Sequence, residues 1–178
     1  ADEFDPAHCI VIDPGMAFGT GDHATTRGVI RLLPSVLRGG DVVADLGAGS
    51  AILAIAAAKL GASRVYAIEL DADAIPNANE NVVRNGVAAT VHVFEGDAAS
   101  LLPLVAPVRV IVANIISSVL IELLPLIAGA LTEDGEAILS GILHEERDVM
   151  MKSLADNGWV VTSEDAEDIW WSVAIKPS

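Results

Sequence analysis

The feature that most constrains this chain is an alternation of short, almost continuous apolar runs with longer segments of helical periodicity. The apolar runs predict strands at residues 42–46, 64–69, 90–94, 108–113, 136–142, 159–163 and 169–175. The longer segments predict helices beginning near Thr25 and at residues 51–60, 73–85, 117–131 and 145–157. Strands that are apolar on both faces are typical of parallel sheets covered by helices on both sides.

The last two apolar runs have no helix between them, so they are expected to form an antiparallel hairpin. The predicted fold is therefore an α/β, doubly wound, mostly parallel seven-strand sheet with one antiparallel strand near the edge. The chain has 178 residues, of which 52% are apolar and 20% charged, and residues 1–178 are expected to form one domain. Its apolar runs are interrupted before the roughly 18 residues of a membrane span, so we expect no membrane segment.

Two glycines follow the first predicted strand, in the run Asp45-Leu46-Gly47-Ala48-Gly49-Ser50, and an alanine-rich helix comes next. Glycines allow a ligand to approach the backbone closely, and the free N–H groups of a helix start attract polar ligands. Glu69 ends the second predicted strand, where a carboxylate can accept hydrogen bonds from ribose hydroxyls. A glycine pair alone is equally typical of a plain turn, but the combination predicts a nucleoside site.

The charge balance bears on the partner, because 10 basic against 25 acidic residues give a net charge of −15. This charge repels nucleic acid and suits a basic protein partner, although many acidic enzymes have no such partner. The single cysteine, Cys9, excludes an internal disulfide and favours a cytoplasmic location. The histidines His8, His92 and His144 lack the spacing of metal ligands, so no metal is predicted.

Several blocks resemble the PrmA family of bacterial ribosomal-protein methyltransferases, which are class I S-adenosylmethionine-dependent enzymes with a Rossmann-like fold. The blocks are Asp13-Pro14-Gly15-Met16-Ala17-Phe18-Gly19-Thr20-Gly21-Asp22-His23-Ala24-Thr25-Thr26, the glycine run, Val112-Ala113-Asn114-Ile115 and Leu139-Ser140-Gly141-Ile142-Leu143. The chain departs from the family at Ala51, usually glycine, at Ala24, usually proline, and at Glu69, usually aspartate. The extra methyl of Ala51 is expected to crowd either the cofactor or the contact between helix and strand. The family's amino-terminal substrate-recognition domain has no counterpart in these residues.

The resemblance implies that S-adenosyl-L-methionine is the cofactor. The residues it assigns to cofactor binding are Phe18, Thr20, Thr26, Asp45, Gly47, Gly49, Glu69, Asp97 and Asn114. Asn114 is also the predicted catalytic residue, since it ends a strand beside the expected position of the reactive methyl group.

Each of these polar residues has an alternative structural role. Either Thr25 or Thr26 could cap the first helix, Asp97 could be another helix cap, and Glu69 could be a solvated carboxylate. Asp45 could order its loop or meet the cofactor's ammonium group, and Asn114 could only hold the following loop. His23 is a candidate base, and a loop histidine is also commonly structural. The resemblance implies that Trp170 and Trp171 could line the substrate entrance, whereas alternation along a strand favours one of them in the core and the other at the rim.

The function that the resemblance implies is methyl transfer to protein amino groups, either a lysine side chain or an amino terminus, of a ribosomal protein. One alternative is a methyltransferase for another protein or for a small molecule. A second is a module that binds the cofactor without turnover. An NAD-dependent oxidoreductase is disfavoured, because the third glycine of a pyrophosphate-binding loop is absent.

Overall fold

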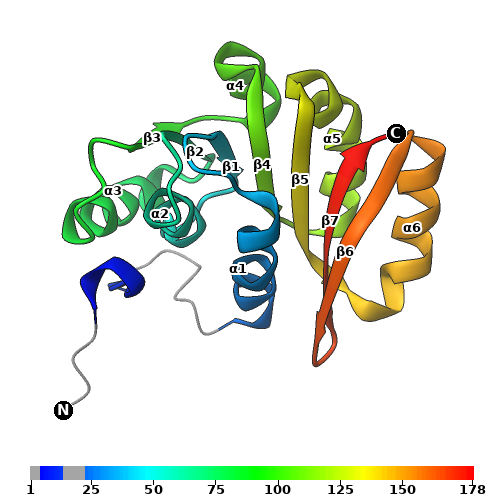
Figure 1. Ribbon diagram of the computed structural model, residues 1–178, viewed down its shortest axis with the longest axis horizontal. Coiled ribbons are helices and arrows are strands. Elements are labelled where there is room, and N and C mark those ends of the chain that lie inside the picture. The colour runs from blue at the N-terminus through cyan, green and yellow to red at the C-terminus, as the bar shows by residue number, and fades with distance from the viewer. Residues whose placement is uncertain (1–4, 14–22) are drawn as a thin grey trace.

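The predicted strands come together in one sheet in the computed structural model, which describes residues 5–13 and 23–178. The strands are β1 (Val42–Leu46), β2 (Arg64–Glu69), β3 (Val91–Glu95), β4 (Val108–Asn114), β5 (Leu131–Leu143), β6 (Trp159–Glu167) and β7 (Trp170–Pro177). Their spatial order is β3-β2-β1-β4-β5-β7-β6 (Figure 1). Strands β1 to β5 are parallel to one another, and β7 is antiparallel to both β5 and β6. The predicted fold class is confirmed.

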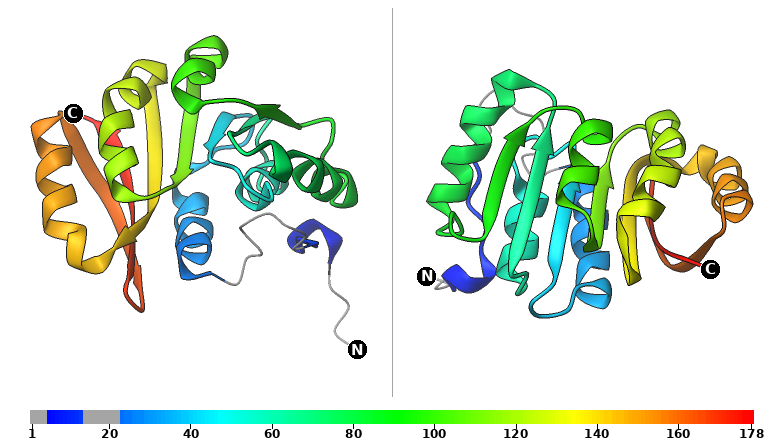
Figure 2. Two further views of the ribbon diagram at one scale, coloured as in Figure 1. Left: turned by 180° about the vertical axis from the view of Figure 1, so that it is seen from behind. Right: turned by 90° about the horizontal axis from the view of Figure 1, so that it is seen from above.

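Helices connect the parallel strands and cover both faces of the sheet. In the described ranges they are α1 (Ala24–Val36), α2 (Ile52–Lys59), α3 (Ile75–Arg84), α4 (Ala98–Val105), α5 (Ser117–Ala130) and α6 (Arg147–Asp156), with short 3-10 turns η1 (Pro6–His8), η2 (Ala72–Ala74) and η3 (His144–Glu146). Helices α1, α2 and α3 lie on one face, and α4, α5 and α6 lie on the other (Figure 2).

The two layers of the core follow from the alternation of side chains along each strand. In β4, Val110 and Val112 face the layer with α1 to α3, whereas Ile111 and Ala113 face the layer with α4 to α6. All four side chains are fully buried. An apolar residue is therefore needed at each of positions 110–113 of this central strand, which is why the run was recognisable from the sequence.

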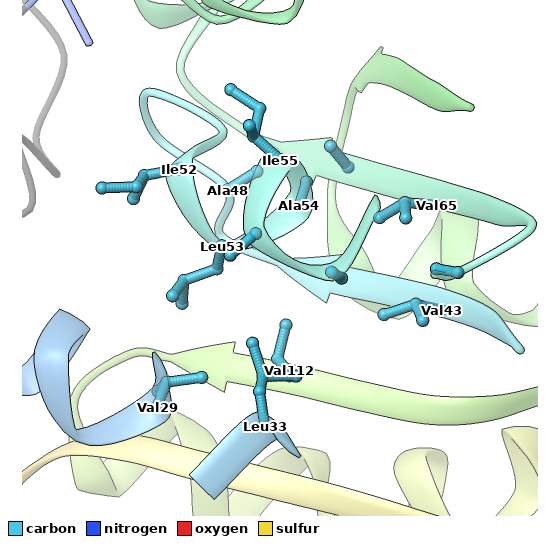
Figure 3. Close-up of a cluster of buried hydrophobic side chains, with 14 of the residues drawn as sticks. Val29, Leu33, Val43, Ala48, Ile52, Leu53, Ala54, Ile55, Val65 and Val112 are labelled. Atoms are coloured by element: carbon cyan, nitrogen blue, oxygen red, sulfur yellow. The ribbon is translucent and has the colours of Figure 1, made fainter. Parts of the chain in front are cut away.

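Helices α1 and α2 meet over the centre of the sheet. Val29 and Leu33 of α1 reach toward Val112 and toward the side of α2 that carries Leu53 (Figure 3). The small side chains of the alanine-rich helix α2 allow it to pack tightly against the sheet, and its residues 52–57 are all buried. This packing fixes the start of α2, where the predicted ligand site lies.

Helix α4 was not predicted. It is eight residues long, contains Pro103, and buries only Leu102 fully among its side chains, so its sequence carries little helical periodicity. One predicted cap was also wrong, because His23, rather than Thr25 or Thr26, is the N-cap of α1. Asp71 caps the turn that leads into α3.

Candidate functional site

A cavity of about 420 Å³ opens where the carboxyl ends of β1, β2 and β4 meet. The direction in which successive strands are added reverses between β1 and β4, and such a switch point is the usual ligand site of an open α/β sheet. The volume lies in the range of small-ligand and cofactor sites. The lining consists of Thr26, Asp45, Gly47, Ala48, Gly49, Ile52, Leu53, Ile68, Glu69, Leu70, Gly96, Asp97, Ala98, Asn114, Ile115, Val119 and Leu123.

The glycine loop between β1 and α2 forms the floor of this cavity. The backbone N–H groups of Gly47 and Ala48 both donate to the carbonyl of Ile68, over 2.9 and 3.0 Å, which ties the loop to β2. Gly47 has a φ of 70°, and a Cβ atom there would lie 3.3 Å from the Cγ1 atom of Ile115. A side chain at this position would therefore strain the backbone and narrow the cavity.

Glu69 holds the same loop from the end of β2. Its Oε1 accepts a hydrogen bond from the Gly49 N–H at 2.8 Å, and its Oε2 accepts one from the Asp71 N–H at 2.8 Å. A carboxylate has about four acceptor sites, so two bonds leave capacity for ligand hydroxyls. The side chain is half-buried and lines the cavity, and the simple alternative of a solvated carboxylate does not describe it.

Asp45 caps helix α2 from a distance. The N-cap residue Ala51 has no side-chain acceptor, and the Asp45 Oδ2 instead accepts from the Ala54 N–H at 3.1 Å. Asp45 is 1% exposed. Burial raises the pKa of its carboxyl group, the Ala54 hydrogen bond opposes this, and the Glu69 charge adds to it, so that the pKa is about 7. The loop-ordering role of Asp45 is therefore present in the structure.

Ala51 itself has a left-handed backbone, with φ 68° and ψ 17°. Its side chain is fully buried in the core beside α2 and does not line the cavity. Of the two expected kinds of crowding, the structure places the methyl group at the contact between helix and sheet. The left-handed conformation costs a residue with a Cβ atom about 1–2 kcal/mol, which explains the value of glycine at this position.

Asn114 and Thr26 lie on the opposite wall of the cavity. The Asn114 Nδ2 donates to the Thr25 Oγ1 at 3.1 Å, and this hydroxyl lies 2.7 Å from the Nδ1 of His23. The Thr25 N–H also donates to that Nδ1, which is therefore an acceptor and receives the hydroxyl proton of Thr25. The chain of bonds fixes the amide of Asn114 and leaves its Oδ1 as the acceptor for a ligand.

Asp97 occupies the N-cap position of α4 and also lines the cavity. Its carboxylate accepts no hydrogen bond from the helix backbone, and its Oδ2 accepts a long one from the Ser100 hydroxyl at 3.4 Å. The Asp97 side chain therefore does not cap α4, in contrast to the structural alternative predicted for it. The exposed carboxylate is positioned to meet a ligand at the β3 end of the site.

The structure brings seven of the nine predicted cofactor contacts to one cavity; they are Thr26, Asp45, Gly47, Gly49, Glu69, Asp97 and Asn114. The other two, Phe18 and Thr20, lie outside the described residues. Sequence reasoning missed the apolar wall made by Ile115, Val119 and Leu123. These residues follow the fourth predicted strand at helical spacing, which would have indicated a helix side facing the site.

The tryptophan pair divides as predicted. Trp171 is 1% exposed and donates its Nε1 hydrogen to Glu164 at 2.9 Å. Trp170 is only half-buried and packs edge-on against the His23 ring, with 5.1 Å between the ring centres. Trp170 thus lies beside the chain of bonds that holds Asn114.

Within residues 5–13 and 23–178, no group of three His, Cys, Asp or Glu side chains is arranged to hold a metal ion. In the same ranges, no helix combines the length and apolar character needed to cross a membrane.

Comparison with known proteins assigns the chain to a family. The family profile described as "Ribosomal protein L11 methyltransferase (PrmA)" matches residues 2–177. Ribosomal protein L11 methyltransferases of Enterococcus faecalis and Pelotomaculum thermopropionicum are 40% and 42% identical over 167 residues, covering 94% of this chain. The alignment covers 52% and 54% of those relatives, so the chain spans about half their length.

A solved structure agrees with this assignment. The crystal structure of a ribosomal protein L11 methylase from Lactobacillus delbrueckii subsp. bulgaricus superposes with a TM-score of 0.83 at 34% identity, covering 93% of this chain and 83% of that one. The shared sheet is the Rossmann-like fold of class I methyltransferases. The chain belongs to the ribosomal protein L11 methyltransferase (PrmA) family.

Proposed function

We propose that residues 1–178 form the catalytic domain of an S-adenosyl-L-methionine-dependent methyltransferase that modifies amino groups of a ribosomal protein. The observation that carries the proposal is the convergence of the seven described contact residues on one cavity at the switch point of the sheet. The family assignment supports it, because the relatives are named as ribosomal protein L11 methyltransferases.

The residues around the cavity fit this cofactor. The Glu69 carboxylate can accept hydrogen bonds from ribose hydroxyls, and Asp97 stands at the neighbouring strand end, where an adenine amino group would find an acceptor. The glycine loop offers a close approach for the methionine part, next to the buried Asp45 carboxylate. When bound, S-adenosylmethionine supplies a methyl group on a positively charged sulfur atom, and the acceptor amine takes that methyl group.

The protein's part in the reaction is mainly positioning, because neither an oxyanion nor a nucleophilic side chain is needed. The Asn114 Oδ1 accepts a hydrogen bond from the incoming amine and directs the nitrogen lone pair toward the methyl group. A lysine amine has an ordinary pKa of about 10.4, and a desolvated site favours its neutral form. The proton lost by the amine passes to water.

A basic protein acceptor suits the net charge of −15, which also opposes direct binding of nucleic acid. The relatives are named ribosomal protein L11 methyltransferases, which supports ribosomal protein L11 as the proposed acceptor. The cytoplasmic location favoured by cysteine usage stays a prediction.

Calorimetric titration with S-adenosylmethionine, S-adenosylhomocysteine and NAD tests the cofactor, and transfer of a labelled methyl group to purified ribosomal protein L11 tests the acceptor. The transfer assay needs both this domain and the full gene product. We expect micromolar-range binding of the two methionine cofactors and none of NAD. Binding of NAD alone would refute the proposal. Cofactor binding without transfer by either protein would point to another acceptor or to a module without turnover.

Glu69→Ala is expected to weaken S-adenosylhomocysteine binding by about 1–3 kcal/mol, since a partly buried acceptor and the anchor of Gly49 are both lost. The change is about 5-fold to 150-fold in Kd by calorimetry. Glu95→Ala is the matched control: Glu95 pairs with Glu69 in the strand register but is exposed and does not line the cavity. Equal affinity in Glu69→Ala and the unmodified protein would mean that the ribose lies elsewhere.

A further inference from the structure

Asn81 of α3 is a fully buried polar residue that does not itself line the cavity. Its Nδ2 donates to the Ser50 carbonyl, the end of the glycine loop, at 3.1 Å. Its Oδ1 accepts from the Asp13 N–H at 3.0 Å and from the Arg84 Nη1 at 2.9 Å. One side chain thus joins two stretches of backbone that are distant in sequence.

Asn81 belongs to a row of three asparagines on one side of α3, spaced by four residues. Asn77 donates to the Asp13 carbonyl at 3.1 Å. Asn85 both donates to the Val11 carbonyl at 2.7 Å and accepts from the Val11 N–H at 2.8 Å. These amides bind the backbone of residues 11–13 as a neighbouring strand would, because a carboxamide offers the same donor and acceptor as a peptide group.

Asn81 differs from its two neighbours in the row because it also reaches the glycine loop. Among the residues that the structure describes, side chains from three elements hold the loop and the helix start that follows it. Asp45 of β1 binds the start of α2, Glu69 of β2 binds Gly49, and Asn81 of α3 binds Ser50. The first two line the cavity and would themselves meet a ligand. Asn81 does not line the cavity, so we expect it to act on the ligand through the loop.

The Ser50 carbonyl precedes the left-handed residue Ala51, so the loop turns sharply at the point that Asn81 holds. Without Asn81, this buried carbonyl loses a donor, which costs of the order of a buried hydrogen bond and favours other loop conformations.

We propose that Asn81 is a positioning residue of the cofactor site, which sets the glycine loop by holding the Ser50 carbonyl against the segment of residues 11–13. The inference rests on the proposed function, since it concerns the affinity of the same cavity for a methionine cofactor. It adds a residue that touches neither cofactor nor acceptor.

The test compares S-adenosylhomocysteine affinity in two Asn81 variants, measured by calorimetry well below each variant's unfolding temperature. Asn81→Ala removes both functions of the amide. Asn81→Asp is nearly isosteric and keeps the acceptor for Asp13 and Arg84, but it replaces the donor that faces Ser50 with an oxygen. We expect both variants to raise the Kd about tenfold, the scale of one lost buried hydrogen bond. In the transfer assay, the KM for the cofactor should rise by the same factor while kcat at saturation changes less than threefold.

Two controls separate positioning from general stability. Asn85→Ala removes an amide from the same row without touching the glycine loop, and its Kd should stay within twofold of the unmodified protein. Val82→Ala removes buried methyl groups next to Asn81 in sequence and should lower the Tm without changing the Kd. Unchanged affinity in Asn81→Asp, or an equal loss in Val82→Ala, would overturn the inference. A parent protein that binds neither methionine cofactor would overturn the proposed function as well, so the two failures are distinguishable.

Discussion

Asn114→Ala is expected to lower the rate of methyl transfer at saturating cofactor about 100-fold, the scale of one lost positioning hydrogen bond in an active site. The Asn114 amide is fixed through its Nδ2 by the Thr25 hydroxyl, and the Oδ1 is left toward the cavity. Its loss leaves the acceptor amine without a partner at the place where its lone pair must be directed. Binding of S-adenosylhomocysteine should weaken less than tenfold.

The measurement is kcat for methyl transfer to ribosomal protein L11 by the full gene product, with the Kd of S-adenosylhomocysteine measured in parallel. Asn157→Ala, at the exposed end of α6, is an asparagine control outside the cavity and should leave both values unchanged. The kcat of Thr25→Val should lie between those of Asn114→Ala and Asn157→Ala, because this variant keeps Asn114 but lacks the hydroxyl that orients the Asn114 amide. A loss of cofactor affinity that accounts for the whole fall in rate would make Asn114 a binding residue only.

Asn114→Asp distinguishes the proposed contact with an amine from a role in loop order. A carboxylate beside the amine stabilises its protonated form and raises its pKa, so less of the reactive neutral amine is present at a given pH. The pH profile of transfer should therefore move to higher pH in this variant. If Asn114 only orders its loop, the profile should fall in height without moving along the pH axis.

The glycine loop and Glu69 were predictable because their signal is local. Each stands at the end of an apolar run, and parallel strands bring such ends to one edge of the sheet. Thr25 and Asn81 were not predictable in their roles, because these depend on contacts with Asn114 and Ser50 that span 89 and 31 positions in the sequence. The position of a buried asparagine along a helix does not indicate which distant residue it binds.

The backbone conformation at position 51 was also not predictable from the sequence, because the residue type there favours a different conformation. Alanine at position 51 favours a helix, and only the structure shows its left-handed turn before α2. The same turn leaves α2 without a capping side chain of its own. Because this cap is missing, the carboxylate of Asp45 from β1 is buried beneath the helix start and accepts the hydrogen bond instead. The sequence around Asp45 alone does not predict this burial.

Asp45→Asn is expected to stabilise the protein above neutral pH and to remove a dependence of stability on pH. The folded-state pKa of Asp45 is about 7 and its ordinary value is 3.8, so the folded state holds the proton more tightly. Between about pH 4 and pH 7 the folded protein binds more protons than the unfolded chain, and stability falls as pH rises. Each unit of pKa difference corresponds to about 1.4 kcal/mol, so the gain of the variant at pH 8 is at most about 4 kcal/mol.

Urea unfolding at several pH values measures this difference between the variant and the unmodified protein. The difference in unfolding free energy should be small near pH 4, grow through pH 7 and then level off. Asp134→Asn is a control of opposite sign. Hydrogen bonds from Thr132 and Arg38 lower the pKa of this exposed carboxyl, so its contribution is lost only as pH falls through the acid range. If the difference in unfolding free energy between Asp45→Asn and the unmodified protein did not change with pH, burial would not raise the pKa of Asp45, and the prediction would be wrong.

The affinity of Asp45→Asn for the cofactor distinguishes two roles of the buried carboxylate, the helix cap and the contact with the cofactor. The amide oxygen of asparagine can still accept from the Ala54 N–H, so the helix cap survives the substitution. If the cap were the only role, the variant would be more stable and would bind S-adenosylhomocysteine as well as before. We expect binding to weaken at least tenfold, because a desolvated carboxylate with the raised pKa gains most from a cationic partner, here the ammonium group of the cofactor. The buried Asp45 carboxylate then lowers the stability of the protein without cofactor, and its contact with the ammonium group compensates for this cost when the cofactor is bound.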